Sequence, residues 1–512
     1  MQRVGVVGAG TMGAGIAQTS AVSGFETVIF DPVEGAGEAG LDRIRSGVQG
    51  AVARGALTGS EGASALRRVA LAGSVSALAG CTIVVEAAPE QLELKRAVFR
   101  DLARVCGEET ILATNTSSIP VTSIAVGVPA PARVVGTHFF NPVPRMRLVE
   151  VVPALQTSVP TLETAVAFCR ALAKTPIVVE DVPGFLVNRC ARPFSGEGLR
   201  LLQERVAAID QIDRICRLGG GFRMGPFELM DLVGNDVSLA VARSLSELSF
   251  GEARWRPSPL QQRLVASGNL GRKSGAGWYS YAEEWPADPA PGAPDGPAVP
   301  PLAILGENSI AARLRAALAA ADRREAVIEA ASLVVVADSS LAAAALPAGR
   351  AVAILSCSSR SLAAWERPEA VGFSLVPGDP HRRLVELTTG ERTPVAHAGA
   401  AASLFRALGF HVEWVEDSPG LVLARIVAQL INEACFAVGE GVASAEAVDE
   451  GVRLGLNYPH GPFEWAETIG WPVVLDVIEG LWRERREERY RPAPLLQRRA
   501  RQARAGTEVG GG

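Results

Sequence analysis

The sequence predicts an α/β protein in which a domain built on a parallel sheet is followed by an all-α domain, and in which both domains then recur in a shortened, degenerate form. Three observations predict this class. Strand-like and helix-like segments alternate through residues 3–182, which is typical of a parallel sheet covered by helices. A glycine-rich turn follows the first strand. Segments beyond residue 300 repeat earlier ones at a constant spacing of 236 residues.

The composition limits the classes of function. A chain of 512 residues with a net charge of −5 favours several compact domains and argues against a nucleic-acid-binding surface. A strand pattern by residue 3 leaves no room for a signal peptide, and no apolar run has the length of a membrane helix. The seven cysteines show no CxxC spacing, which is typical of reduced thiols. We therefore expect a cytoplasmic protein with no nucleic-acid partner, no membrane partner and no metal site.

The first strand, RVGVVG, leads into a glycine-rich turn and then a helical pattern. The turn is Gly8-Ala9-Gly10-Thr11-Met12-Gly13. Between a strand and a helix, GxGxxG lets a pyrophosphate approach the positive helix N-terminus, which predicts a Rossmann domain. A second strand ends at Asp31, whose carboxylate suits a ribose 2′-hydroxyl and would repel a 2′-phosphate. NAD is therefore predicted, with another nucleotide or a vestigial turn as the alternative.

Later strand-like runs each end in polar residues. The runs span 81–90, 110–120 and 133–140, and Glu90, Ser117 and His138 fall at or just past their ends. Ligands of open parallel sheets bind beyond the carboxyl ends of the strands. These three side chains are therefore expected to converge on the nicotinamide.

The segment THFFNPVPRMRLVE, residues 137–150, predicts two strands around a proline-rich turn. His138 and Glu150 would then meet across the hairpin. A carboxylate fixes the tautomer of a histidine and favours its imidazolium form, so such a pair can accept a hydroxyl proton near neutral pH. The alternative is a hydrogen-bonded histidine without catalytic function at a polar hairpin end.

These motifs resemble those of the L-3-hydroxyacyl-CoA dehydrogenase family. GAGTMG, VVEAAPE, NTSS, HFFNPVP, LVEV, PGFLVNR and MGPFELMDLVG occur in that family's order over residues 1 to about 282. The resemblance implies that NAD oxidises an S-3-hydroxyacyl-CoA thioester to the 3-ketoacyl-CoA. It implies that His138 is the general base, that Glu150 orients it, and that Ser117 and Asn188 contact the reacting end of the substrate. It also implies that the NAD site is lined by Asp31, Glu90, Lys95, Asn141 and Lys273.

One pair of positions departs from the family pattern. Where the family offers a serine and a lysine to coenzyme A, this sequence has Gly47 and Arg54. Arg54 can still bind a phosphate in bidentate fashion, whereas the serine contact is lost. The alternative is that Arg54 is an ordinary surface residue.

The second half reads as a decayed copy of the first. Leu148-Val149-Glu150 recurs as Leu384-Val385-Glu386, and Pro183-Gly184-Phe185 as Pro419-Gly420-Leu421. At the same spacing, Ser374, Pro377 and Ala424 replace His138, Asn141 and Asn188. The predicted parts are a Rossmann domain (1–182), a helical substrate and dimerisation domain (183–282), a linker (283–300), a Rossmann-like unit without NAD (301–400) and a second helical domain (415–495). We expect this copy to be structural, to pack on residues 184–282 and to complete the acyl or CoA pocket.

Several questions stay open at this point. The repeat resembles long bacterial members of the family that are associated with phenylacetate degradation and act on 3-hydroxyadipyl-CoA; a 3-hydroxybutyryl-CoA or general β-oxidation dehydrogenase is the alternative. Other possibilities are a dehydrogenase with a lysine base, for which Lys174 lacks the surrounding motif, and a non-catalytic NAD- or acyl-CoA-binding protein. The family commonly forms a homodimer, but the second copy could occupy that surface. A dicarboxylic acyl chain would need a distal cation, and the candidates are Arg189, Arg192, Arg200 and Arg223.

Overall fold

The computed structural model of the chain describes residues 3–282, 288, 300–339, 341, 352–378 and 383–509. The chain forms two compact units. Met1–Arg189 and Gly441–Leu456 belong to the first unit, and Cys190–Glu440 and Asn457–Gly512 belong to the second. The first unit thus takes one short segment from the C-terminal half.

The first unit contains an eight-stranded sheet with the strand order β3-β2-β1-β4-β5-β6-β7-β8. Its strands are β1 (Arg3–Val7), β2 (Glu26–Phe30), β3 (Val69–Leu71), β4 (Ile83–Glu86), β5 (Ile111–Thr114), β6 (Val134–Phe139), β7 (Leu148–Pro153) and β8 (Thr175–Val178). All neighbouring strands are parallel except β6 and β7. The order 3-2-1-4-5-6 is that of a dinucleotide-binding sheet, so the predicted Rossmann domain is confirmed.

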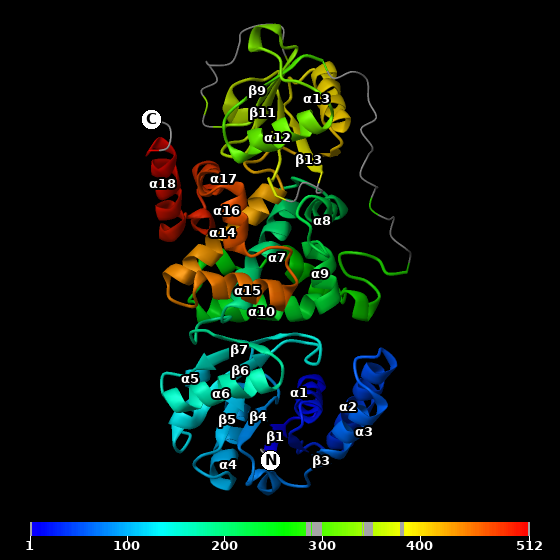
Figure 1. Cartoon of the computed structure of the whole chain (residues 1–512), viewed down its shortest axis with the longest axis vertical. Helices are drawn as coiled ribbons and strands as arrows, with labels where there is room; N and C mark the ends of the chain where they lie inside the picture. The colour runs from blue at the N-terminus through cyan, green and yellow to red at the C-terminus, as the bar shows by residue number, and fades with distance from the viewer. Residues whose placement is uncertain are drawn as a thin grey trace. The chain divides into compact units, whose positions relative to one another are not determined.

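Helices cover this sheet, and the buried strands are accordingly rich in valine and isoleucine. The helices of the first unit are α1 (Thr11–Val22), α2 (Ala36–Ala53), α3 (Gly59–Arg67), α4 (Leu92–Val105), α5 (Val121–Ala125), α6 (Val159–Ala171) and α15 (Ala445–Leu456). In Figure 1, strands β4 to β7 lie side by side with α6 in front of them.

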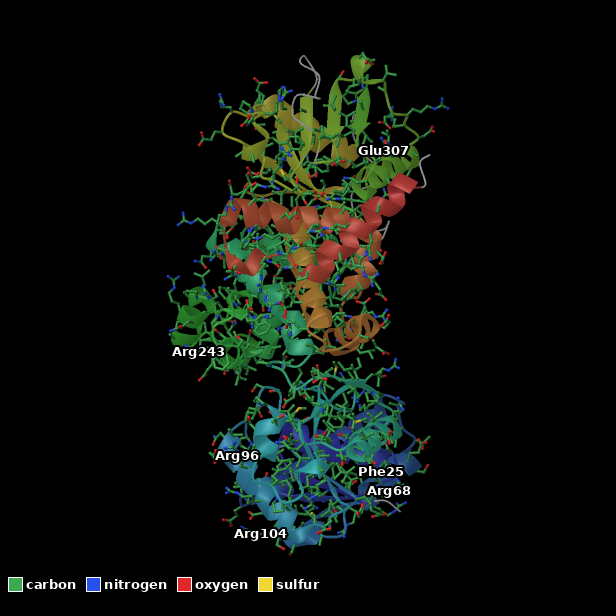
Figure 2. All side chains as sticks on the ribbon, turned by 90° about the vertical axis from the view of Figure 1, so that its left-hand side faces the viewer. Phe25, Arg68, Arg96, Arg104, Arg243 and Glu307 are labelled. Carbon is green, nitrogen blue, oxygen red and sulfur yellow. The ribbon has the colours of Figure 1, made fainter. Side chains whose placement is uncertain are left out.

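Helix α4 illustrates how the sequence pattern sets the packing. Phe99 and Leu102 are fully buried, while Arg96 and Arg104 lie on the outer side of the helix (Figure 2). Each of these arginines pairs with an acid three residues before it. The apolar stripe at helical spacing therefore attaches α4 to the sheet, and the arginines face solvent.

Helix α15 comes from the second half of the sequence but packs on the sheet of the first unit. A Cβ atom on Gly455 would lie 2.9 Å from the Leu148 side chain and 3.2 Å from Val187, and one on Gly451 would lie 2.9 Å from Leu186. Because the two glycines are four residues apart, they share one face of the helix. The missing side chains let α15 approach β7 closely.

The second unit contains a six-stranded sheet with the order β14-β13-β12-β11-β10-β9. Its strands are β9 (Leu302–Leu305), β10 (Leu333–Val336), β11 (Val352–Ser356), β12 (Val371–Ser374), β13 (Leu384–Thr389) and β14 (His411–Trp414). Only β12 and β13 are antiparallel neighbours. Figure 1 shows α12 (Ser309–Ala320) and α13 (Val395–Ala407) beside these strands.

The remaining helices form two similar sets. Helix α7 (Val187–Gln203) starts at the end of the first unit. The others are α8 (Ile209–Leu218), α9 (Pro226–Val233), α10 (Asn235–Leu248), α11 (Pro259–Ala266), α14 (Leu423–Gly439), α16 (Pro462–Ile469), α17 (Trp471–Arg485) and α18 (Pro494–Val509). Ion pairs join the two halves within the second unit, since the buried Arg425 on α14 contacts Glu197 on α7 and Glu204 just after the end of α7.

The internal repeat extends to whole elements. β13, α13, β14, α14 and α16 have the bounds of β7, α6, β8, α7 and α9 shifted by 236 residues. In the described part of the second half, α12 leads from β9 towards β10 without counterparts of β2 and β3. The predicted fold class, including the shortened second Rossmann-like unit, is therefore confirmed.

The domain boundaries drawn from the sequence stay predictions. The linker predicted at 283–300 lies outside the described residues, apart from Asp288 and Pro300. Within the described ranges, no helix combines the length and apolar character needed to cross a bilayer.

Candidate functional site

His138 and Glu150 face each other on adjacent antiparallel strands. They are register partners on β6 and β7, and His138 Nδ1 lies 2.6 Å from Glu150 Oε2. Both side chains are almost fully buried. The predicted contact across the hairpin is confirmed. Because Nδ1 is engaged with a carboxylate, we assign its hydrogen there, which leaves Nε2 as a proton acceptor.

The other carboxylate oxygen of Glu150 is held by the backbone. Oε1 accepts hydrogen bonds from the amides of Leu186 (3.0 Å) and Val187 (2.8 Å) at the start of α7. Glu150 therefore cannot rotate without losing bonds from two elements. The rings of Phe140 and Phe185 lie 4.5 Å and 5.9 Å from the His138 ring and give the imidazole an apolar surround.

Ser117 lies in a loop organised by Glu90. Glu90 Oε1 accepts hydrogen bonds from the amides of Ser117 (2.9 Å) and Ser118 (3.0 Å) and from the Thr116 hydroxyl (2.7 Å). Burial raises the pKa of Glu90, but the Lys95 ammonium and these donors outweigh burial and leave it below its usual value. The loop beyond β5 is thus fixed by an ionised carboxylate.

Asn188 is brought to the same loop, since its side-chain amide donates to the Ser117 carbonyl at 3.3 Å. Asn115 ties the loop to β6, because its Oδ1 accepts a hydrogen bond from the Phe139 amide at 2.9 Å. Ser117 and Asn188 are therefore adjacent, and Asn115 links their loop to the residue after His138.

The glycine-rich turn has the geometry that a dinucleotide requires. Gly8 has φ +96°, and a Cβ atom there would lie 2.7 Å from the Ala87 carbonyl, while a Cβ atom on Gly10 would meet open space. Helix α1 begins at Thr11, and Asp31 Oδ2 accepts a hydrogen bond from the Ala9 amide at 2.7 Å. The turn is thus compact where the chain folds and open at Gly10. This cradle fits NAD, with the helix N-terminus toward a pyrophosphate.

Gly13 is required for packing, because a Cβ atom there would overlap the Gly8 carbonyl oxygen. Met12 packs its side chain on the core of the first unit. These two members of the predicted set thus shape the turn.

Lys95 is buried and paired with two glutamates, whereas a residue that contacts a cofactor directly would face the open site. Its ammonium lies 2.8 Å from Glu86 and 3.4 Å from Glu90, and only 1% of the side chain is exposed. Glu86 also accepts hydrogen bonds from the Ala88 amide and the Thr114 hydroxyl. Lys95 is therefore a buried cation that holds Glu90 at the carboxyl edge of the sheet.

A cavity of about 830 Å³ adjoins the turn. It is lined by Thr11, Asn141 and Arg54 together with Gly47, Arg43 and Arg145. Residues predicted for the cofactor and for coenzyme A thus share one cavity, and its three arginines favour an anionic ligand.

Lys273 lies in the second unit, where its ammonium contacts Asp236 at 2.6 Å. Its assignment to the NAD site stays a prediction.

Sequence reasoning missed two residues that brace the site. Lys174 is buried and donates to the carbonyls of Val143 (2.6 Å) and Met146 (2.8 Å) in the loop after His138, and burial lowers its pKa to about 8. Asp181 accepts hydrogen bonds from the amides of Val121 and Thr122 at the start of α5. The rarity of lysine, three residues in the chain, was the available signal for Lys174; nothing local singled out Asp181.

Two family models match the chain. The NAD binding domain of 3-hydroxyacyl-CoA dehydrogenase matches residues 3–182. The C-terminal domain of 3-hydroxyacyl-CoA dehydrogenase matches twice, at residues 184–281 and 420–512. The duplicated helical domain is thus recognised in both halves.

Known proteins match over the whole chain and over its first half. The 3-hydroxyadipyl-CoA dehydrogenase of Escherichia coli (strain K12) is 37% identical over 98% of both chains. A probable 3-hydroxybutyryl-CoA dehydrogenase of Bacillus subtilis (strain 168) is 39% identical over 56% of this chain and 99% of its own length. A crystal structure of a 3-hydroxybutyryl-CoA dehydrogenase from Escherichia coli K12 superimposes with a TM-score of 0.82 at 35% identity, covering 99% of both chains.

Proposed function

The chain belongs to the family of NAD-dependent 3-hydroxyacyl-CoA dehydrogenases, and from that premise we propose that its preferred substrate is a dicarboxylic thioester, 3-hydroxyadipyl-CoA. The observation that carries the substrate is the likeness to the Escherichia coli 3-hydroxyadipyl-CoA dehydrogenase over 98% of both chains. A second candidate is 3-hydroxybutyryl-CoA, because the solved structure that covers 99% of the chain carries that name.

The buried pair of His138 and Glu150 supports the proposed proton transfer. His138 Nε2 accepts the proton of the 3-hydroxyl group, and Glu150 stabilises the imidazolium that forms at 2.6 Å from its Oε2. Bound NAD supplies the acceptor for the hydride that leaves C3, so the products are NADH and the 3-ketoacyl thioester. In the reverse direction the imidazolium returns the proton to the keto oxygen.

Ser117 and Asn188 are proposed to position the reacting end of the substrate. The Asn188 side-chain amide donates to the backbone carbonyl of Ser117, and this bond keeps the amide near the Ser117 hydroxyl at the carboxyl edge of the sheet. Donors fixed in this way lower the cost of orienting C3 in line for transfer.

The proposed NAD contacts follow from the glycine-rich turn and from Asp31, the residue after β2. The amides at the start of α1, with Gly8, Gly10 and Gly13 shaping the turn, would hold the pyrophosphate, and Asp31 the ribose hydroxyls. Glu90, held by Lys95, and Asn141 are assigned to the nicotinamide half of the cofactor, and Lys273 completes the proposed set.

The phosphates of coenzyme A are assigned to the cavity that Arg54 lines. Arg43 and Arg145 line the same cavity, so three guanidinium groups replace the serine and lysine expected from the family. Guanidinium groups bind phosphate oxygens in bidentate fashion.

The second half is proposed to be structural. Its helix α15 packs on Leu148 and Val187. Leu148 lies two residues before Glu150 on β7, and the Val187 amide donates a hydrogen bond to Glu150. Deleting residues 301–512 removes this helix, so we expect an insoluble or inactive protein. A soluble product with unchanged kinetics would refute this role.

We propose that the enzyme works in the cytoplasm, because its seven cysteines are free and buried, as expected in a reducing compartment. We also propose that the protein forms a homodimer. Light scattering that gives the mass of one chain would refute it.

The first experiment is to measure initial NADH formation with S-3-hydroxybutyryl-CoA and 3-hydroxyadipyl-CoA in parallel. The proposal expects higher kcat/KM for the dicarboxylic thioester, abolished by His138→Ala. Equal or faster oxidation of the short chain would favour the second candidate. No oxidation of either thioester, with NAD binding retained, would indicate a binding protein.

A further inference from the structure

Gln18 on α1 carries a buried amide without a hydrogen-bond partner. The residue is 7% exposed, and among the residues that the structure describes its side chain forms no hydrogen bond. Gln429 on α14 is buried to a similar degree, but its amide donates to the Arg489 carbonyl at 3.2 Å. Buried amides are normally paired, because an unsatisfied one costs free energy. The Gln18 amide is therefore free for a ligand.

Gln18 lines the cavity of about 830 Å³ beside the glycine-rich turn. Thr11 and Gly15 line it too, and their spacing to Gln18 is that of one helix face. A rise of 1.5 Å per residue places Gln18 about 10 Å along α1 from Thr11, where the NAD pyrophosphate is assigned. Asp31, the proposed partner of the NAD ribose, is not among the described residues that line the cavity. The proposed NAD contacts thus do not account for Gln18.

Gly47 on α2 makes room for this amide. A Cβ atom at position 47 would lie 2.2 Å from Gln18 Oε1 and 3.1 Å from Gln18 Nε2, so any larger residue there would displace the carboxamide. Position 47 is where the family offers a serine to coenzyme A. In this chain the carboxamide of Gln18 enters the space that the serine would occupy, so a different hydrogen-bonding group lines the same cavity.

The cations of the cavity indicate which part of coenzyme A lies beside Gln18. Arg43, Arg54 and Arg145 line the cavity and are exposed, and none of them forms an ion pair within the described ranges. These guanidinium groups suit the phosphates at the nucleotide end of coenzyme A. A neutral carboxamide instead presents a donor next to an acceptor, and this pair matches the amino group and ring nitrogen on the edge of adenine.

We propose that Gln18 binds the adenine base of coenzyme A. The amide oxygen accepts a hydrogen bond from the N6 amino group, and the amide nitrogen donates to the adjacent ring nitrogen. The inference rests on the proposed function, because it assigns one contact at the nucleotide end of the thioester substrate. The base supplies the partner that the buried amide lacks in the protein alone, and glycine at position 47 keeps the amide in reach of it.

The first experiment compares coenzyme A with 1,N6-etheno-coenzyme A, whose N6 no longer donates a hydrogen bond. Calorimetry should show that the wild-type protein binds the etheno derivative about 10-fold more weakly. Gln18→Met keeps the length of the side chain without its amide, so it should bind both ligands with the same, about 10-fold reduced affinity. Equal affinity of the wild type for both ligands would overturn the inference. So would an equal difference in wild type and Gln18→Met, because the bulk of the extra ring would then cause it.

A second measurement separates the adenine of coenzyme A from that of NAD. Gln18→Met should raise KM for the acyl-CoA thioester about 10-fold, whereas its affinity for NADH, measured by fluorescence titration, should match that of the wild type. Weaker binding of NADH with unchanged binding of coenzyme A would assign Gln18 to NAD and overturn the inference. Gln49→Met is the matched control, since Gln49 is an exposed glutamine on α2, and it should change neither affinity.

Substitutions at position 47 separate hydrogen bonding from packing. Gln18→Ala empties the space beside Gly47, so a second substitution, Gly47→Ser, can offer a hydroxyl there. The double variant Gln18→Ala/Gly47→Ser should bind coenzyme A about 3-fold more tightly than Gln18→Ala. Gln18→Ala/Gly47→Ala fills the space without a hydroxyl and should gain nothing. Equal gains in both double variants would show that Gln18 only fills space, and would overturn the inference.

The outcomes distinguish this inference from the proposed function. Because Gln18 acts on the nucleotide end, Gln18→Met should weaken 3-hydroxyadipyl-CoA and S-3-hydroxybutyryl-CoA by the same factor. A wild-type preference for the dicarboxylic thioester, together with no effect of Gln18→Met on either KM, refutes the inference alone. A loss of coenzyme A affinity in Gln18→Met, in an enzyme without that preference, supports the inference and refutes the dicarboxylic substrate.

Discussion

The two halves of the chain preserve the same acid in the same place, but only the first half pairs it with a histidine. Glu150 and Glu386 are the counterparts, each on the strand after the antiparallel turn. Glu386 accepts hydrogen bonds from the amides of Val422 and Leu423, as Glu150 does from Leu186 and Val187. The register partner of Glu386 is Ser374, in place of His138.

This difference shows that the carboxylate serves the fold as well as the chemistry. Two buried amides at the start of a helix need an acceptor, and losing it would leave both unsatisfied. The histidine has no such duty and is replaced by serine in the second half. A retained acid is therefore weak evidence of catalysis, whereas an acid with its histidine is strong evidence.

The largest effect should separate His138 from its counterpart Ser374. His138→Ala removes the proposed general base and should lower kcat about 10³-fold, with NAD binding unchanged, as measured by NADH formation and by fluorescence titration of NADH. The counterpart Ser374→Ala should leave kcat unchanged. Equal losses in both variants would refute the assignment of chemistry to the first half.

The next prediction tests whether Glu150 serves both the chemistry and the fold. Glu150→Gln places an amide where an acceptor is needed and should lower kcat about 10²-fold or more, because the tautomer of His138 is no longer fixed. In the second half, Glu386→Gln should affect stability and not kcat. If Glu150→Gln kept full activity while Glu386→Gln lost it, the comparison would be reversed.

A smaller effect should come from two glycines, one in each half, that allow a helix to pack closely on a strand. Gly455 lies against Leu148 and Val187, and its counterpart Gly219 lies against Leu384 and Leu423. Gly455→Val and Gly219→Val should each destabilise the protein by about 1–3 kcal/mol through overpacking, measured by denaturant unfolding. Only Gly455→Val should lower kcat, by several fold. Loss of activity in Gly219→Val alone would contradict the proposed structural role of the second half.

The smallest effect is a dependence of stability on pH. Burial raises the pKa of Glu386 to about 8, above the value in an unfolded chain, so the folded protein keeps a proton that the unfolded chain releases. Stability is therefore lost as pH rises from about 4.5 to 8, by at most about 1.4 kcal/mol per pH unit. Glu386→Gln should remove this dependence on pH. The stability of the variant relative to that of the wild type should therefore increase between pH 5 and pH 8. The free energy of unfolding of both proteins is measured against pH. If it changes with pH in the same way in both, Glu386 is ionised in the folded protein and the prediction is wrong.

The sequence predicted the parts that local pattern controls. A separation of twelve positions from His138 to Glu150, with prolines at the turn, was enough to place both residues on one hairpin, and the spacing of 236 residues located Ser374 and Ala424. The close approach of α15 to β7 was not predictable, because Gly451 and Gly455 are unremarkable within a helix pattern. The pairing of Lys95 with Glu86 depends on a tertiary contact between a helix and a strand, which no local signal reports.

The first unit is discontinuous in the chain, since Gly441–Leu456 joins Met1–Arg189. On the ribosome, the nascent dehydrogenase sheet must therefore wait while about 250 further residues are made, a delay on the order of tens of seconds. During that interval β7 exposes to water the apolar surface that α15 later covers. The first half, which carries His138, thus depends for its completion on a helix from the second half, where Ser374 takes the place of that histidine.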